Sequence, residues 1–353
     1  MDRCRRCIIP RGYPRVTFDE TGCCSLCRDH EPIRYRGIEA LRSDITAMLS
    51  RHPRRQYDVV VGLSGGRDSS YLLHVLRREL GLRVLAFFVD HGWIPEEAHG
   101  NARRLAEVLD VPLVMHRSHR LQRCFPHQWN AWLRRPRPHT LSTLCMGCKS
   151  AIIQCFYKYA RRHDTPLLSL GWTPFEEASY KMDLMRADAL PGTIAPYAAG
   201  YAGEVLRNPA LALHPACSAT QLLEFWVFFG PYKRWGNRLH HKVEVKPFAE
   251  YIRWVEKDVD AILEREYGWR RLPGMTTNWR GDCYLAPVRQ HLYRTLLGYD
   301  DKTVQLSALI RDGQLTREQA LARHDRDGVA EEVLENCCRH LGIRAEAVRA
   351  IAR

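Results

Sequence analysis

Short apolar runs alternate with amphipathic segments through the first half of the chain. The runs at 57–63, 83–89, 111–115 and 166–171 have the length of buried parallel strands, and the first of them is rich in β-branched residues. The segments before and between these runs, at 37–50, 70–76, 95–109 and 150–162, space their apolar residues as helices do. This alternation predicts an α/β fold, with helices on both faces of a doubly wound parallel sheet.

The second half of the chain has a weaker pattern. Residues 173–215 are rich in loop formers, and residues 221–229 are an apolar helix candidate. From about residue 285 to the end the pattern is helical, and Thr316 to Gln319 fits a capping box at the start of one helix. We therefore expect a mostly helical C-terminal region.

Composition places the chain among globular proteins. Its 353 residues are 45% hydrophobic, which suffices for one sizeable α/β domain with smaller attachments. No apolar run reaches the ~20 residues that span a bilayer, and the first residues do not resemble a signal peptide. We expect a cytoplasmic protein without a membrane partner. The net charge of +13 comes from scattered Arg, which favours a site for anionic nucleotides and leaves an RNA partner open.

The cysteines change this picture. We do not expect disulfides from the 13 Cys of a cytoplasmic chain. Cys4 and Cys7 form one CxxC pair and Cys24 and Cys27 a second, with 16 residues between the pairs. Two such turns can close a tetrahedron of thiolates around Zn²⁺, and metal binding would supply the folding energy of so short a segment. The spacing predicts a structural zinc ribbon, in which Cys23 is a competing ligand.

A glycine-rich segment follows the first strand directly and opens the next helix: Ser64-Gly65-Gly66-Arg67-Asp68-Ser69. Two glycines let the backbone approach an anion and direct N–H groups at it, and the helix N-terminus adds its positive end. Ser64 and Ser69 can donate hydrogen bonds to phosphate oxygens. Asp68 cannot bind phosphate directly, so it caps the helix or holds Mg²⁺. The segment is neither a Walker A loop nor a GxGxxG dinucleotide loop.

This segment resembles the phosphate loop of the PP-loop ATP pyrophosphatase superfamily. Members of that superfamily cleave ATP between the α and β phosphates and adenylate a carbonyl, carboxyl or amide oxygen, and a nitrogen or sulfur nucleophile then displaces AMP. The resemblance implies catalytic roles for Asp68 and for Asp90, at the end of the second strand; a turn or capping role is the alternative for Asp90. It also implies that ATP binds at five residues: Ser64, Gly65, Gly66, Asp68 and Ser69.

The two ends of the chain resemble the N-acetyl sugar amidotransferases, which are PP-loop enzymes of bacterial surface-polysaccharide synthesis. At the start, the resemblance rests on the two CxxC pairs and on residues 15–22 between them. Near the end it rests on residues 305–318, QLSALIRDGQLTRE. This branch implies that ammonia from a partner glutaminase is the nucleophile.

The middle of the chain resembles a different branch, the sulfur-inserting PP-loop enzymes. A third CxxC, formed by Cys145 and Cys148, opens the helix expected before the fourth strand. In those enzymes a CxxC and one distant Cys hold a [4Fe-4S] cluster, and the fourth iron stays free to carry sulfide. The resemblance implies Cys283 as the third ligand, with Cys217 in reserve. A buried Cys pair or a second zinc site is the alternative.

These features predict three domains: a zinc ribbon at residues 1–36, a PP-loop ATP-binding α/β domain at 37–200, and a mostly helical region at 201–353. The leading hypothesis is adenylation by ATP and Mg²⁺ followed by sulfur insertion into a nucleobase, a tRNA base or a natural-product precursor, with a separate sulfur donor. The second hypothesis is an N-acetyl sugar amidotransferase. The third is a nucleotide-binding zinc-ribbon regulator without catalysis.

The acceptor pocket has one candidate location. Residues 173–200 follow the fourth strand at the edge of the sheet where α/β proteins bind ligands. Four charged residues there are candidates to line the pocket: Glu176, Glu177, Lys181 and Arg186. A solvated charged loop is the alternative.

Overall fold

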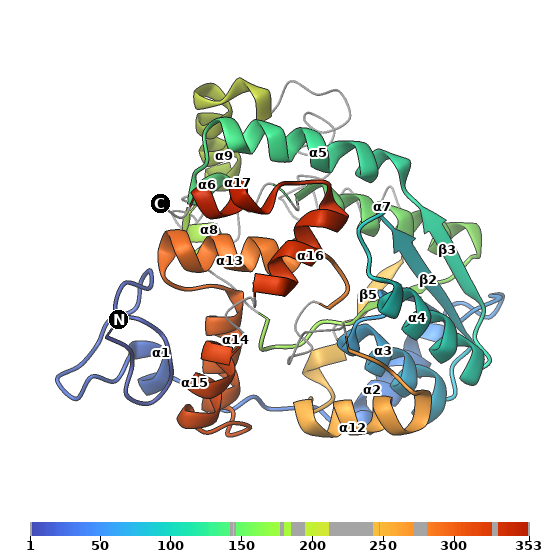
Figure 1. Cartoon of the computed structure of the whole chain (residues 1–353). Helices are drawn as coiled ribbons and strands as arrows, with labels where there is room; N and C mark the ends of the chain where they lie inside the picture. Colours follow the sequence, from blue (N-terminus) through green and yellow to red (C-terminus); the bar gives the residue numbers. More distant parts are fainter. Residues whose placement is uncertain are drawn as a thin grey trace.

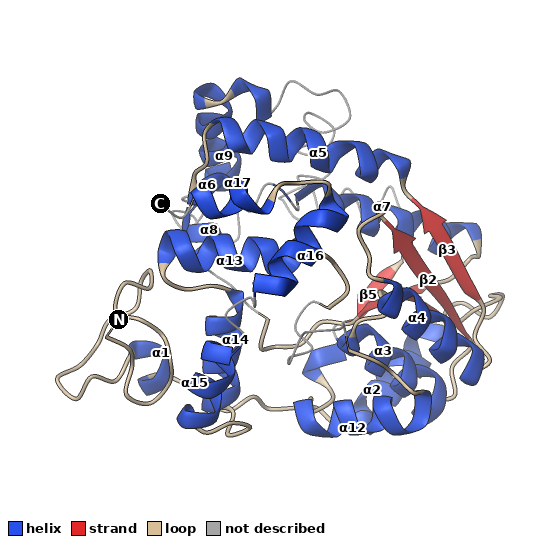
Figure 2. Ribbon diagram, viewed as in Figure 1, coloured by secondary structure: helices blue, strands red, loops and turns tan. Residues whose placement is uncertain are grey.

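The computed structural model describes residues 2–141, 144, 146–176, 180–184, 195–211, 243–246, 248–271, 281–326 and 331–351. Within these ranges the chain forms one five-stranded sheet in the order β3-β2-β1-β4-β5 (Figures 1 and 2). All four pairs of neighbouring strands are parallel. The strands are β1 (Val59–Gly62), β2 (Val84–Asp90), β3 (Leu113–Arg117), β4 (Leu167–Leu170) and β5 (Glu244–Lys246). The predicted fold class is confirmed.

Successive residues of each strand pack on opposite faces of the sheet, because side chains alternate with a period of two. Val59 and Val61 belong to a core with α2 (Ile38–Leu49), α3 (Arg67–His74), α4 (Glu96–Val108) and α12 (Glu256–Tyr267). Val60 belongs to a second core with Phe156 and Ala160 of α7 (Met146–Arg162). Both faces of β1 are therefore covered, which explains its uninterrupted apolar sequence.

The C-terminal region is helical, as the pattern predicts. Its helices are α13 (Leu285–Leu297), α14 (Asp301–Arg311), α15 (Arg317–Arg326), α16 (Glu331–Leu341) and α17 (Ala345–Ala350). The capping box at the start of α15 is confirmed. The Thr316 backbone N–H donates to Gln319 Oε1 at 2.9 Å, and the Gln319 N–H donates to Thr316 Oγ1 at 3.2 Å.

The expectation for residues 173–215 was wrong in part. This stretch holds α8 (Tyr180–Leu184) and α9 (Ala195–Arg207) besides loop. The sequence of α9, APYAAGYAGEVLR, is dominated by Ala and Gly, so it shows no contrast between apolar and polar positions. The helix candidate at 221–229 lies outside the described residues.

The N-terminal module (residues 2–30) lies beside α14 and α15, at the other end of the chain (Figure 1). The Ile8 backbone N–H donates to Ser307 Oγ at 3.4 Å. Arg317 Nε donates to the carbonyl oxygens of Cys4 and Cys7 at 3.0 and 3.1 Å. Because Ile8 is buried between Leu306 of α14 and Ala320 of α15, the module is fixed to these helices by apolar contacts as well.

The domain boundaries at residues 36 and 200 stay predictions. None of the helices in the described ranges combines the length and the apolar character needed to cross a bilayer.

Candidate functional site

The glycine-rich segment Ser64–Ser69, called the phosphate loop below, connects β1 to α3. Its strand lies between β2 and β4, where the order of strands reverses direction along the chain. In open α/β sheets, ligands bind outside the carboxyl ends of the strands at such a switch point. Gly66 is the N-cap of α3 and makes no side-chain cap hydrogen bond to the helix, and its own N–H donates to Ser64 Oγ at 3.3 Å.

Gly65 fixes the path of the phosphate loop. Its φ is +76°, a conformation that L residues with a side chain rarely adopt, and a Cβ there would lie 1.9 Å from the carbonyl oxygen of Ala98 in α4. The Gly65 carbonyl accepts hydrogen bonds from Asn101 Nδ2 at 3.3 Å and from Trp269 Nε1 at 3.0 Å. The glycine is needed because the loop backbone packs directly against the backbone of a helix.

Ser64 and Ser69, both predicted to bind phosphate, are brought together by the loop. Their hydroxyl oxygens lie 3.1 Å apart. Ser69 Oγ also accepts from the Ser64 N–H and donates to the Gly66 carbonyl, both at 3.1 Å. The hydroxyls therefore close the turn of the loop here, and they would exchange these partners for phosphate oxygens when an anion binds.

The two predicted catalytic carboxylates have different surroundings. Asp68 lies in the first turn of α3 and accepts from Arg67 Nε at 3.3 Å. Asp90 ends β2, and its Oδ1 accepts from the Gly92 N–H at 2.7 Å, which is the turn role weighed as its alternative. Their catalytic roles stay predictions.

A third carboxylate reaches the phosphate loop from the C-terminal region. Asp282 Oδ2 lies 3.2 Å from the position that a Cβ would take at Gly66. The Tyr284 N–H donates to the Trp93 carbonyl at 3.0 Å, so the turn that carries Asp282 is bound to the segment after β2. Sequence reasoning missed Asp282, since it is far from the loop along the chain and belongs to no local motif.

His91 lies between these segments and is buried. Burial lowers its pKa, while the negative charges of Asp282 and Asp90 oppose that effect. Its Nδ1 accepts from the Trp93 N–H at 3.3 Å, which leaves Nε2 to carry the proton of the neutral ring. The site therefore combines a half-buried serine, a buried serine and three carboxylates with a neutral, buried imidazole.

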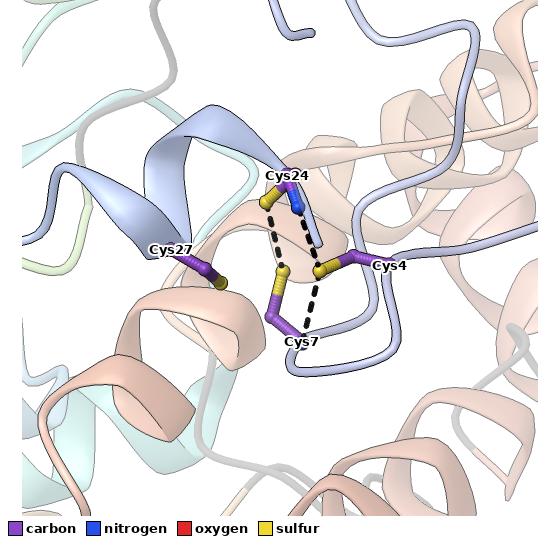
Figure 3. Close-up of side chains that lie close together, drawn as sticks. All are labelled: Cys4, Cys7, Cys24 and Cys27. Carbon is purple, nitrogen blue, oxygen red and sulfur yellow. Dashed lines mark hydrogen bonds between the residues drawn. The ribbon is translucent and has the colours of Figure 1, made fainter. Parts of the chain in front are cut away.

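The four cysteines of the N-terminal CxxC pairs are buried and form one group. One sulfur from each lies within 4.8 Å of the others, and Figure 3 shows the four side chains converging. Cys7 Sγ lies 3.6 Å from Cys24 Sγ. The backbone N–H groups of Cys7 and Cys24 donate to Cys4 Sγ at 3.4 and 3.3 Å. Cys23 is not part of this group.

The donor set fits a zinc ion. Hydrogen bonding from Cys24 lowers the pKa of the Cys7 thiol, and hydrogen bonding with Cys24 raises the pKa of the Cys27 thiol. Without a cation, four buried thiols at this spacing cannot all ionise, because the thiolates repel one another. A divalent ion that prefers tetrahedral sulfur would remove this conflict. Zinc at the site stays a prediction.

The third cysteine group is only partly described. Cys145 and Cys217 lie outside the described residues, and Cys148 lies in the first turn of α7, where its side chain is not described. Cys283 is half-buried and packs on a cluster that contains Leu144, Tyr284 and Leu285. Leu144, the residue before Cys145, therefore belongs to the same apolar cluster that Cys283, the predicted third ligand, contacts.

Of the four acceptor-pocket candidates, Lys181 is well placed in the structure. Its Nζ lies 2.5 Å from Asp301 Oδ2, and the Tyr180 hydroxyl donates to the same carboxylate at 2.6 Å. Lys181 is thus a half-buried residue of α8 that pairs with α14, and its role in an acceptor pocket stays a prediction. Glu176 is half-buried, whereas Glu177 and Arg186 lie outside the described residues.

Three comparisons relate the chain to known proteins. A family model for the C-terminal domain of LPS biosynthesis protein WbpG-like proteins matches residues 274–353. The tRNA(Ile)-lysidine synthase of Nitratidesulfovibrio vulgaris is 46% identical over 68 residues, which are 18% of this chain and 19% of that protein. The chain therefore spans about a fifth of the length of this curated relative.

Among solved structures, the U34-tRNA thiolase NcsA from Methanococcus maripaludis, with its [4Fe-4S] cluster, aligns over 97% of this chain and 89% of its own, at 13% identity and a TM-score of 0.38. The NH3-dependent NAD synthetase from Campylobacter jejuni aligns over 57% and 93%, at 16% identity and a TM-score of 0.30. The predicted resemblance to the PP-loop superfamily is confirmed, and it rests on the local sequence match.

The contact of Gly65 with α4 predicts that this glycine cannot be replaced. We expect Gly65→Ala to cost about 2–5 kcal/mol, since the added Cβ collides with a backbone oxygen at a positive φ. Gly81→Ala is the matched control: it has a φ of +69° and no atom within 4 Å, so it should cost only about 1–2 kcal/mol. Denaturant unfolding measures both, and equal losses would contradict the role of the contact.

The four-cysteine group predicts one tightly held zinc per chain. We expect Cys4→Ser to lose this zinc and to lower the thermal midpoint by about 5 °C or more, because metal binding supplies folding energy. Cys155→Ser, on α7, is the control and should keep the zinc. Metal analysis of the full-length protein is the measurement; a zinc-free wild-type protein of unchanged stability would rule the site out.

Proposed function

We propose that this protein adenylates an acceptor oxygen with ATP and then replaces that oxygen with sulfur. The observation that supports the first step best is the phosphate loop at the switch point of the sheet, with an uncapped helix N-terminus and two serine hydroxyls side by side. The resemblance to the PP-loop superfamily supports the use of ATP.

In the first step the triphosphate binds to the N–H groups of the loop and of the α3 N-terminus. Ser64 and Ser69 donate hydrogen bonds to phosphate oxygens. The acceptor oxygen attacks the α-phosphorus, and pyrophosphate leaves. Asp68 is the residue that would hold Mg²⁺, and bound Mg²⁺ supplies positive charge that stabilises the leaving pyrophosphate. Asp90 faces the same edge of the sheet and orients the nucleotide.

In the second step a sulfur nucleophile attacks the activated carbon, and AMP leaves with the former acceptor oxygen. Cys145, Cys148 and Cys283 are the residues that would hold a [4Fe-4S] cluster. A cluster bound by three thiolates supplies one open iron, at which sulfide is carried. One observation supports this assignment: Leu144, the neighbour of Cys145, belongs to the apolar cluster on which Cys283 packs.

The acceptor we propose is a nucleobase, either free or within tRNA, or a natural-product precursor. The local similarity to a tRNA(Ile)-lysidine synthase supports a tRNA base in particular. The sulfur comes from a separate donor, and the reaction takes place in the cytoplasm. In this scheme the zinc ribbon is structural, because four thiolates leave no open position on the metal.

A second candidate keeps the first step and uses ammonia as the nucleophile. The WbpG-like match over residues 274–353 favours it, because that family is named for LPS biosynthesis. The acceptor would then be the N-acetyl group of a sugar, and a partner glutaminase would supply the ammonia. A nucleotide-binding regulator without catalysis is the third candidate, and turnover of ATP to AMP would exclude it.

The phosphate loop predicts that ATP is cleaved to AMP and pyrophosphate in the presence of the acceptor. We expect Ser64→Ala to lower this turnover about 100-fold, because it removes one hydrogen-bond donor to the charge that develops on phosphate. Ser50→Ala, at an exposed helix end, is the control and should leave turnover unchanged. Product analysis by anion-exchange chromatography is the measurement, and ADP as the sole product would refute the proposal.

The third cysteine group predicts an oxygen-sensitive iron–sulfur cluster. After anaerobic purification we expect about four iron and four sulfide per chain. Cys145→Ser should lose the chromophore and the sulfur-containing product, while formation of the adenylated acceptor survives. Iron and sulfide analysis with absorption spectroscopy is the measurement. A colourless, iron-free and fully active enzyme would instead favour ammonia transfer, which incorporation of ¹⁵N from labelled ammonium would establish.

A further inference from the structure

Arg67 is the one cation inside the phosphate loop, yet it is not placed to bind phosphate. Its side chain is 2% exposed, and its guanidinium lies over the ring of Trp254, with Cζ 4.6 Å from the ring centroid. Nη1 lies 2.8 Å from Glu256 Oε1 and 3.7 Å from Asp260 Oδ1, both on α12. The guanidinium of Arg67 therefore pairs with carboxylates of α12.

The buried positive charge of Arg67 requires carboxylates beside it. Burial alone would lower the pKa of Arg67, but the negative charges of Asp68, Glu256 and Asp260 outweigh burial and raise it. Arg67 is also the first residue of α3, where the helix dipole disfavours a cation. A buried, unpaired guanidinium at this position would be strongly destabilising, so the carboxylates of α12 are needed to hold the loop in its present path.

Glu256 connects Arg67 to a second arginine. Its Oε1 faces Arg67, and its Oε2 lies 2.7 Å from Arg323 Nη1 on α15. The two arginines keep the pKa of Glu256 below its ordinary value, although burial opposes this. The carboxylate thus joins the phosphate loop to α15.

A second contact connects the start of α12 to the segment before α15. Gln314, just before α15, accepts from the Glu256 backbone N–H at 2.9 Å and donates to the Trp254 carbonyl at 2.9 Å. The start of α12 is therefore fixed by the segment that leads into α15.

The other attachment of α15 is the four-cysteine module. Arg317, its first residue, donates to the carbonyls of Cys4 and Cys7, and Ala320 packs on Ile8. One helix thus contacts the metal-binding turns at its start and the Glu256–Arg67 pair further along. A continuous series of charged and hydrogen-bonded contacts runs from the cysteine carbonyls to the phosphate loop.

We propose that α15 couples the four-cysteine module to the phosphate loop through four positioning residues: Arg67, Glu256, Arg317 and Arg323. When the module is folded around its metal, α15 is held in place, and Glu256 is held against Arg67. Nucleotide affinity at the loop then depends on metal occupancy of a site that takes no part in the chemistry. The inference rests on the proposed function in taking ATP as the ligand of the loop.

Thermodynamic linkage gives the proposal a quantitative form. If metal occupancy raises nucleotide affinity by some factor, nucleotide binding must raise metal affinity by the same factor. Couplings of this kind are commonly about 5- to 150-fold. We expect a factor at the lower end, about 5- to 10-fold, because Arg67 keeps Asp68 and Asp260 as partners when Glu256 is displaced.

The first test is the affinity of Mg²⁺ and α,β-methylene-ATP, measured by calorimetry on the full-length, zinc-loaded protein. We expect Arg323→Gln to weaken binding about 5- to 10-fold and Arg323→Lys, which keeps the charge facing Glu256, to restore most of it. Arg349→Gln removes ion pairs to Glu331 and Glu335 and should change nothing. Unchanged affinity in Arg323→Gln would overturn the coupling, whereas no binding by the wild type would refute the proposed function instead.

The second test separates coupling from general loss of structure. Arg317→Gln should retain one zinc but bind the analogue about 5-fold more weakly. Chelation of zinc should weaken binding in the wild type by the same factor by which the analogue tightens zinc, and should have no further effect in Arg317→Gln. Equal analogue affinity in zinc-loaded and chelated wild type would overturn the proposal.

Discussion

The site depends on one close approach between two backbones. At Gly65 the phosphate loop packs on the Ala98 carbonyl so tightly that no side chain fits, and Asn101 and Trp269 donate hydrogen bonds to the Gly65 carbonyl. This contact decides where the N–H groups of the loop lie relative to the ends of β1 and β2. A second close approach fixes α3 in the same way. A Cβ at Gly171, which follows β4, would lie only 2.5 Å from the backbone of Ser69. The loop is carried by the sheet, and Gly65 and Gly171 allow the backbone to approach the helices this closely.

The C-terminal part of the chain completes the surroundings of the loop. Asp282 reaches Gly66, Trp269 binds Gly65, and Glu256 pairs with Arg67. Each of these contacts comes from a residue after β5, the last strand in the described part of the chain. The loop therefore has two kinds of support: a local one from the strand–turn–helix connection, and a distant one from segments that close over it. The distant support contains most of the charge.

The sequence predicts the local support well and the distant support hardly at all. The apolar run before Ser64 and the helical spacing after it identify β1, the loop and α3, because these signals depend on neighbours along the chain. The four-cysteine group is equally visible, because ligand spacing within a CxxC is a local property. Asp282, Trp269 and Glu256 carry no such signal, since their contacts are made only after the chain folds back. The loop motif assigns no role to Arg67, and only the folded structure shows that it is buried among carboxylates.

The docking of the first residues on α15 has a consequence for the order of folding. Cys4 and its hydrogen-bond donor Arg317 are separated by 313 residues. At about 5–20 residues per second, a ribosome takes roughly 15–60 s to make that length of chain. Throughout this interval the helices that cover Ile8 have not yet been made. The four thiols of the cysteine turns are therefore exposed while the rest of the chain is synthesised. Protection of these thiols from oxidation during translation therefore bears on the yield of native protein.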